Sequence, residues 1–254
     1  MLSRDEILEY VGQYNRYQVE KDYLQHIVLS QIYANVSNEL VFKGGTALQK
    51  VYALNRFSED LDFTLNAGQI RETGSSVFER IERGLNGINN FYGSEYKKEI
   101  KDTAVTYKLK INGPLFIRPQ STQTILVEIS TREKIIKKPD ILLITPIFKD
   151  ICPYFSSVMS LDEILAEKTR AILTRQKARD MYDFYFLLHK GATVNVEYIN
   201  KKLEYYNKKF SKAEFVRNVR SLKGVWNAEL SVLMKTVPDF KVIEEYVVGA
   251  IKQS

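Results

Sequence analysis

The chain has 254 residues, of which 44% are hydrophobic and 12% aromatic, so it can fill a folded core and is not a disordered chain. Its single cysteine, Cys152, excludes an internal disulfide and is typical of a reducing compartment. The net charge of +6 is compatible with a polyanionic partner, and most of the excess follows Asn195, where 11 Lys+Arg stand against 7 Asp+Glu.

The N-terminal part is predicted to be helical. Ser3 and Glu6 form a capping-box pattern, and an apolar stripe predicts a longer helix from about Val19 to Val36. His26 in that helix has no metal-ligand partners at a suitable spacing, so we interpret it as a packing or surface residue. The polar start of the chain predicts no secretory leader, and no apolar run approaches the roughly 18 residues of a membrane span. We therefore expect a cytoplasmic protein without a membrane partner, in which Cys152 is inert packing.

The most informative stretch runs from Leu40 to Leu65. An apolar triplet leads into Lys43, Gly44 and Gly45, and Thr46 is expected to cap the helix that follows. Glycines allow a ligand to approach the backbone closely, and the amides at a helix start favour an anion such as phosphate. This pattern predicts a phosphate-binding turn, although a simple turn glycine pair would give the same local sequence.

A strand follows, with Leu61, Phe63 and Leu65 on one face. Asp60 and Asp62 fall on the other face, where two carboxylates repel each other unless a cation lies between them. Mg²⁺ prefers oxygen ligands of this kind. The alternative is a pair of solvated aspartates at the edge of a sheet.

The middle of the chain is predicted to add a helix, a loop and two strands. Residues 77–88 have helical periodicity, the turn-rich ranges 66–74 and 86–93 are expected to be loops, and alternation marks strands at 105–111 and 124–130. Glu128 interrupts the second apolar run, and a charge is costly to bury there without a partner. It therefore either faces water at a sheet edge or belongs to a site.

Residues 135–153 are expected to form an irregular connector, and later periodicity is helical. Ser160 and Glu163 suggest a capping box for a helix that carries Lys168 and Arg175 on an otherwise small or apolar face. Asp180 and Asp183 lie on one side of the next helix, which Gly191 is expected to end. Further on, Tyr205 and Tyr206 lie among lysines that either bind nucleic acid or cover a solvated helix; these lysines are Lys201, Lys202, Lys208 and Lys209.

Two groups of motifs together resemble the AbiEii/AbiGii-type toxin family of the polymerase-β-like nucleotidyltransferase superfamily. The first comprises Lys43-Gly44-Gly45-Thr46-Ala47-Leu48 and Arg56-Phe57-Ser58-Glu59-Asp60-Leu61-Asp62-Phe63. The second comprises Glu167-Lys168, Arg175 and Arg179-Asp180-Met181-Tyr182-Asp183. The likeness extends from Val19 to about Leu188 and is loose beyond it.

The resemblance implies an α+β fold with a polymerase-β-like nucleotidyltransferase core in residues 1–155 and a helical domain in residues 156–254. It implies that Asp60, Asp62 and Glu128 hold Mg²⁺, or Mn²⁺, and that Lys168 contacts the triphosphate of an NTP while Asp183 or Asp180 orients it. The same NTP would be bound by residues of the turn and of the segment after it, namely Lys43, Gly44, Gly45, Thr46, Arg56 and Ser58.

The resemblance also implies an RNA acceptor, notably the 3′ end of tRNA, and a cognate antitoxin protein as partner. Two alternatives remain at this stage. One is a nucleotidyltransferase that modifies a small molecule or a protein hydroxyl, and the other is a non-catalytic RNA-binding or complex-forming module. Metal-dependent incorporation of label from an NTP supports a transferase, whereas RNA binding that is insensitive to metal supports the non-catalytic module.

Overall fold

The computed structural model describes residues 1–69 and 76–253. The chain divides into two compact units. Unit 1 comprises Met1–Ala53, Phe57–Ile135 and Pro139–Val158, and unit 2 comprises Leu54–Arg56, Ile136–Lys138 and Met159–Ser254. Two short segments that precede Met159, Leu54–Arg56 and Ile136–Lys138, therefore belong to the same unit as the C-terminal helices.

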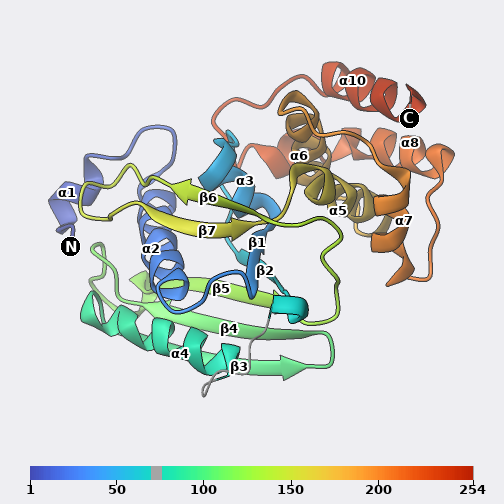
Figure 1. Cartoon of the computed structure of the whole chain (residues 1–254). Helices are drawn as coiled ribbons and strands as arrows, with labels where there is room; N and C mark the ends of the chain where they lie inside the picture. The colour runs from blue at the N-terminus through green and yellow to red at the C-terminus, as the bar shows by residue number, and fades with distance from the viewer. Residues whose placement is uncertain (70–75, 254) are drawn as a thin grey trace. The chain divides into compact units, whose positions relative to one another are not determined.

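Unit 1 is built on a seven-stranded mixed sheet with the order β3-β4-β5-β2-β1-β7-β6 (Figure 1). β2 pairs in parallel with β5, and β1 pairs in parallel with β7, while the remaining neighbours are antiparallel. The strands are β1 (Leu40–Lys43), β2 (Leu61–Leu65), β3 (Ser94–Lys101), β4 (Ala104–Ile111), β5 (Gln123–Ser130), β6 (Asp140–Ile144) and β7 (Tyr154–Val158).

The helices of unit 1 follow capping signals that are visible in the sequence. Ser3 and Ser76 both form capping boxes, and α2 starts with a third one at Asn15. The long helix α2 packs beside α4 and contacts β5 and β7. The helices are α1 (Arg4–Leu8), α2 (Arg16–Tyr33), α3 (Gly44–Tyr52) and α4 (Val77–Gly87), and η1 (Ala67–Gln69), η2 (Ile88–Asn90) and η3 (Pro119–Ser121) are short 3₁₀ turns.

The predicted alternation in β4 and β5 is confirmed. Val105, Tyr107 and Leu109 of β4 lie opposite Ile129, Val127 and Ile125 of β5, and all six are buried. Each fully buried aliphatic side chain of this kind contributes about 1.5–3 kcal/mol. This paired row joins the core that α2 and α4 cover, so it fixes which face of β5 is apolar and therefore which face carries Glu128.

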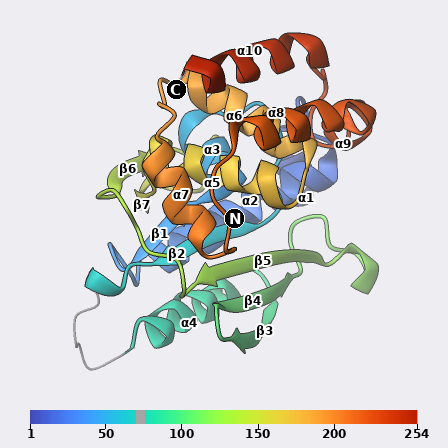
Figure 2. The ribbon, with the colours of Figure 1, turned by 90° about the vertical axis from the view of Figure 1, so that its right-hand side faces the viewer.

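Within the described residues, unit 2 contains helices and connecting segments but no strand (Figure 2). Its helices are α5 (Leu161–Thr174), α6 (Ala178–His189), α7 (Val196–Glu204), α8 (Lys212–Ser221), α9 (Trp226–Leu230) and α10 (Phe240–Gln253), with a 3₁₀ turn η4 (Leu222–Gly224). Gly191, with φ +87°, follows the end of α6 as predicted, because glycine adopts this left-handed conformation without a Cβ clash.

Several local predictions were wrong. Residues 135–153 are not an irregular connector, because β6 lies within them, and α4 and η2 occupy much of the expected loop at 86–93. Cys152 is exposed and not packed in the core. The predicted loop at 66–74 begins with η1, and its residues 70–74 lie outside the described residues.

Candidate active site

The turn from β1 into α3 requires glycine at position 44. Lys43 is extended, with φ −146° and ψ −171°, and Gly44 then takes φ +75° to reverse the chain into α3. A Cβ atom on Gly44 would lie 2.5 Å from Asp62 Oδ2, so the Asp62 carboxylate rests against the bare Cα of this glycine. The glycine turn and the predicted metal carboxylate therefore form one compact site in unit 1.

Gly44→Ala is expected to destabilise unit 1 by about 1–3 kcal/mol and to displace the Asp62 carboxylate, because alanine meets both strain and a clash. Urea unfolding of the variant measures the loss. Gly12→Ala is the control, since a Cβ there has nothing within 4 Å, and it should stay within about 0.5 kcal/mol of the parent. Equal stability of all three proteins would contradict the geometry of the turn.

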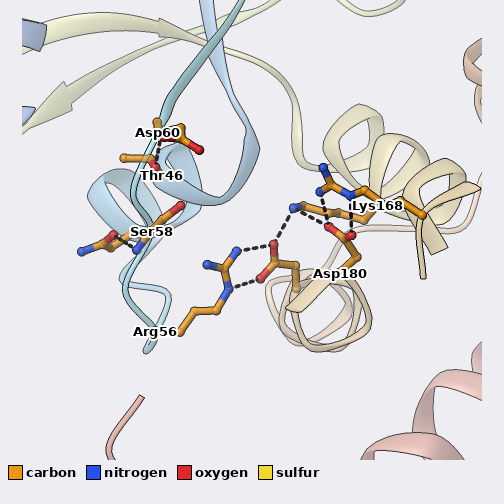
Figure 3. Close-up of polar contacts among 9 residues, drawn as sticks. Thr46, Arg56, Ser58, Asp60, Lys168 and Asp180 are labelled. Carbon is orange, nitrogen blue, oxygen red and sulfur yellow. Dashed lines mark hydrogen bonds and ion pairs between the residues drawn. The ribbon is translucent and has the colours of Figure 1, made fainter. Parts of the chain in front are cut away.

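Thr46 does not cap α3. The N-cap residue is Lys43, without a side-chain cap, and the Thr46 hydroxyl instead donates a hydrogen bond to the backbone oxygen of Asp60 (Figure 3). Thr46 is fully buried. Its side chain therefore ties the residue before β2 to the start of α3, and the predicted contact of Thr46 with phosphate stays a prediction.

Glu128 lies beside Asp62, because the two residues are direct partners in the parallel pair β2–β5 and so project from the same face of the sheet. The pKa of Glu128 is raised, first by burial and then by the negative charge of Asp62, with a smaller contribution from Asp60 in the same direction. Lys43, the cross-strand partner of Asp62, acts in the opposite direction. The sheet thus brings two of the three predicted metal carboxylates together.

These carboxylates match the donor chemistry of a hard divalent cation, which would remove the repulsion that raises the pKa of Glu128. Within residues 1–69 and 76–253, however, no three acidic, histidine or cysteine side chains are close enough to share one ion as they stand. The residues present therefore fit a metal in type and in the pairing of Asp62 with Glu128, and the part of Asp60 in holding the metal stays a prediction.

The segment that leads into Asp60 is held by two glutamines that the sequence analysis missed. Gln25 of α2 donates to the backbone oxygens of Ser58 and Glu59 at 3.0 and 2.8 Å. Gln49 of α3 accepts from the Ser58 N–H at 3.0 Å. Ser58, predicted to contact phosphate, is thus fixed through its backbone. The position of a glutamine in a helical pattern does not indicate which distant backbone groups its side chain will contact, and Gln25 lies 33 positions before Ser58.

Lys43 also has a partner that was not predicted. Its Nζ atom lies 2.6 Å from Glu133 Oε2, and both side chains are largely buried. Glu133 follows β5 by three residues, so the chain returns a carboxylate to the end of β1. Lys43 therefore carries its positive charge next to Asp62 and Glu128 as part of an ion pair.

Unit 2 contains a buried ionic network centred on Asp183 of α6. Arg56 contacts the two Asp183 oxygens at 2.6 Å each, and Lys168 of α5 lies 2.6 Å from Asp183 Oδ2. Lys168 also lies 3.2 Å from Asp180, which in turn accepts two hydrogen bonds of 2.8 Å from Arg175 (Figure 3). Arg56, Lys168 and Arg175 therefore form one connected network with the two aspartates.

The two aspartates of this network are kept ionised by their cations. Burial alone would raise both pKa values, but Arg56 and Lys168 hold the pKa of Asp183 below its usual range, and Lys168 with Arg175 lowers that of Asp180. Lys168 contacts both aspartates, so each of them helps to orient it. Lys168 belongs to unit 2, whereas Asp60 and Asp62 belong to unit 1. The prediction that these residues serve one site stays a prediction.

Two predictions about the surface of unit 2 were wrong. The Ser160 side chain does not cap α5, and Glu163 instead accepts hydrogen bonds from the N–H groups of Ile136 and Lys137. Lys202 is not an exposed member of a basic patch, because it is fully buried and lies 2.7 Å from Glu163. An amphipathic helical pattern does not reveal that one of its lysines points inward to a carboxylate.

Comparisons with known proteins give one family match and two solved structures with a similar fold. The model of the family described as nucleotidyl transferase AbiEii toxin, type IV toxin–antitoxin system, matches residues 27–247. No curated protein sequence matches the chain. Among the described residues, no helix is long and apolar enough to cross a membrane.

Two solved structures from Helicobacter pylori share the fold. JHP933 aligns with a TM-score of 0.56 and 18% identity, covering 95% of this chain and 93% of its own. A candidate nucleotidyltransferase aligns with a TM-score of 0.58 and 20% identity, covering 91% of this chain and 93% of its own. The family match extends over both the glycine turn and the ionic network of α5 and α6. The chain belongs to the AbiEii family of nucleotidyltransferase toxins of type IV toxin–antitoxin systems.

Proposed function

We propose that this nucleotidyltransferase requires Mg²⁺, or Mn²⁺ in its place, and transfers a nucleoside monophosphate from an NTP to the 3′ hydroxyl of an RNA, with tRNA as the natural acceptor. The observation that carries the proposal is the contact of Asp62 with Gly44, with Glu128 paired beside it. A turn that exposes backbone to a ligand and a pair of repelling carboxylates are thereby joined in one place.

In this proposal each residue has a role that follows from its position. The amide end of the nine-residue helix α3 attracts the phosphates, at the turn where Gly44 lies against the Asp62 carboxylate. Asp62, Glu128 and Asp60 would hold the metal, which when bound neutralises phosphate charge and activates the acceptor oxygen. Thr46 and the two glutamines keep the Asp60 segment in place.

The reaction forms a bond between the acceptor oxygen and the α-phosphorus and breaks the bond from that phosphorus to the bridging oxygen. Pyrophosphate leaves, and the acceptor hydroxyl loses its proton. Lys168 supplies positive charge to the triphosphate, and Asp180 and Asp183 fix the direction of its side chain. Arg56 acts through Asp183, because its guanidinium is buried against that carboxylate.

The membership in a toxin family implies an antitoxin partner, and we expect the cognate antitoxin to oppose this activity in the cytoplasm, where NTP and tRNA are both available.

The acceptor is tested by incubating the protein with α-labelled NTPs and Mg²⁺ in the presence of tRNA. Label should enter tRNA that has an intact 3′ hydroxyl and should not enter tRNA that ends in a 3′-deoxynucleotide. Labelling of a small molecule or of protein, with both tRNAs unlabelled, would contradict the RNA acceptor.

A further inference from the structure

A separate cavity of unit 1 lies between α1, the start of α2 and the loop that precedes β5, with a volume of about 290 Å³. Arg4, Arg16 and Arg118 line it from these three segments, and all three are exposed. Among the described residues, none of these arginines forms an ion pair with a carboxylate. The cavity therefore presents three guanidinium groups that are available to an anion.

The acidic residue that lines the cavity, Glu20, forms no ion pair with these arginines among the described residues. Glu20 is buried, and it accepts hydrogen bonds from the Leu115 N–H at 2.6 Å and from Gln123 Nε2 at 2.7 Å. Its pKa is raised by burial, against the effect of these two hydrogen bonds. Glu20 is thus engaged in the floor of the cavity, while the arginines lie at its exposed margin.

The walls between the arginines are apolar and aromatic. Tyr17 is 49% exposed and Ile117 is 66% exposed, and Leu8 also lines the cavity. At the floor, Gln123 donates through Nε2 to Tyr17 O and to Glu20, which leaves its buried Oε1 atom as an acceptor without a partner among the described residues. A ligand that fills the cavity can satisfy this acceptor with an N–H group.

We propose that this cavity binds one nucleotide unit, with its phosphate on the arginines and its base against Tyr17. Guanidinium groups bind phosphate oxygens in a bidentate manner, and a base stacks on an aromatic ring and supplies N–H donors. The volume lies near the lower limit of roughly 300 Å³ for ligand pockets, which suits a single nucleotide. The unit is either a free mononucleotide or one residue of a single RNA strand.

This cavity is distinct from the proposed active site. Gln123 and Glu128 lie five positions apart on β5, which corresponds to roughly 16 Å along a strand. An odd separation also places their side chains on opposite faces of the sheet. The proposed nucleotide site consequently shares no residue with the Gly44 turn or with the paired carboxylates.

The charge of the cavity is tested with the double variant Arg16→Ala/Arg118→Ala. The matched control is Lys97→Ala/Lys108→Ala, which removes two exposed lysines that face each other across β3 and β4, outside this cavity. Fluorescence anisotropy with labelled AMP and with a labelled 12-nucleotide single-stranded RNA is recorded in EDTA over a range of salt concentrations. EDTA suppresses metal-dependent binding at the active site.

The arginine variant is expected to bind at least one of these two probes about tenfold or more weakly than the parent, whereas the lysine variant changes less than about threefold. If the source is an RNA strand, the slope of log K against log salt concentration should fall by roughly 0.7 in magnitude, because the arginines hold one phosphate of a single strand. Loss of AMP binding without a change for RNA identifies a free mononucleotide as the source. Equal behaviour of the two double variants with both probes would overturn the proposal.

Stacking is tested separately at Tyr17. Tyr17→Phe should retain binding of the affected probe, and Tyr17→Ala should weaken it by about fivefold or more, the change that corresponds to roughly 1 kcal/mol of stacking. Polyglutamate serves as a competitor of different chemistry. If the arginine variant lost binding of polyglutamate while it bound both nucleotide probes as the parent does, the cavity would be a site for an acidic protein and the proposal would be overturned. A failure of NTP transfer to RNA would count against the proposed function but not against these binding results.

Discussion

Asp62→Asn is expected to reduce nucleotidyl transfer by at least about a thousandfold while unit 1 stays folded. Asparagine keeps the shape that rests against Gly44 but removes the charge that a metal requires. The same change removes the negative charge beside Glu128, so the pKa of Glu128 should fall toward its ordinary value. Transfer of labelled nucleotide, circular dichroism and carboxyl NMR of Glu128 measure the three effects.

The control for this prediction is Asp102→Asn. Asp102 is an exposed aspartate in the β3–β4 turn and lies outside the candidate site, so its variant should transfer nucleotide at the parental rate. Asp60→Ala should also abolish transfer without unfolding the protein. Transfer near the parental rate in the Asp62 variant, or a pKa of Glu128 that does not change, would refute the pairing of these carboxylates as the functional site.

Asp183→Asn is expected to destabilise unit 2 by about 3–5 kcal/mol, because the buried Arg56 and Lys168 both lose their main counter-charge. Lys168→Ala should cost less, since Asp183 keeps Arg56 and Asp180 keeps Arg175. It should nevertheless weaken NTP binding strongly, and Lys168→Arg should rescue poorly, because a planar fork does not replace a compact charge. Urea unfolding and NTP binding are measured on the same samples.

Lys177→Ala is the matched control for this network. Its ion pair with Glu229 is at the surface, with the lysine side chain 52% exposed, so the loss should stay below about 1 kcal/mol. If the free energy of unfolding of Asp183→Asn lay within about 1 kcal/mol of the parental value, the buried network would contribute no more than an exposed ion pair does. If Lys168→Ala bound NTP as the parent does, Lys168 would be a structural residue only.

The sequence predicted those features that depend on short-range periodicity. The alternation of β4 and β5, the glycine turn and the end of α6 at Gly191 all follow from residue spacing within a few positions. β6 and β7 were missed because neither alternates: four of the five side chains of β6 are exposed or half-buried, and β7 carries two buried serines, Ser156 and Ser157.

The side-chain partners were less predictable than the elements. Arg56 and Asp183 are 127 positions apart, and no local pattern indicates that they form a buried pair. Thr46 and Ser160 both stand where a helix cap is expected, yet Thr46 contacts the Asp60 backbone and Ser160 leaves the capping role unfilled. In both cases a tertiary contact outweighs the local preference: Thr46 donates to Asp60, and Glu163 binds the segment at Ile136.

The central claim is that the α-phosphate of an NTP, with its nucleoside, is transferred to the acceptor. It is tested most directly by incubating the protein with tRNA and Mg²⁺ and with the same NTP labelled at either the α- or the γ-phosphate. The account predicts that the α-label becomes attached to the tRNA and that the γ-label is released as pyrophosphate, with both results lost in EDTA and in Asp62→Asn. Attachment of the γ-label to the acceptor would show phosphoryl transfer and contradict the account.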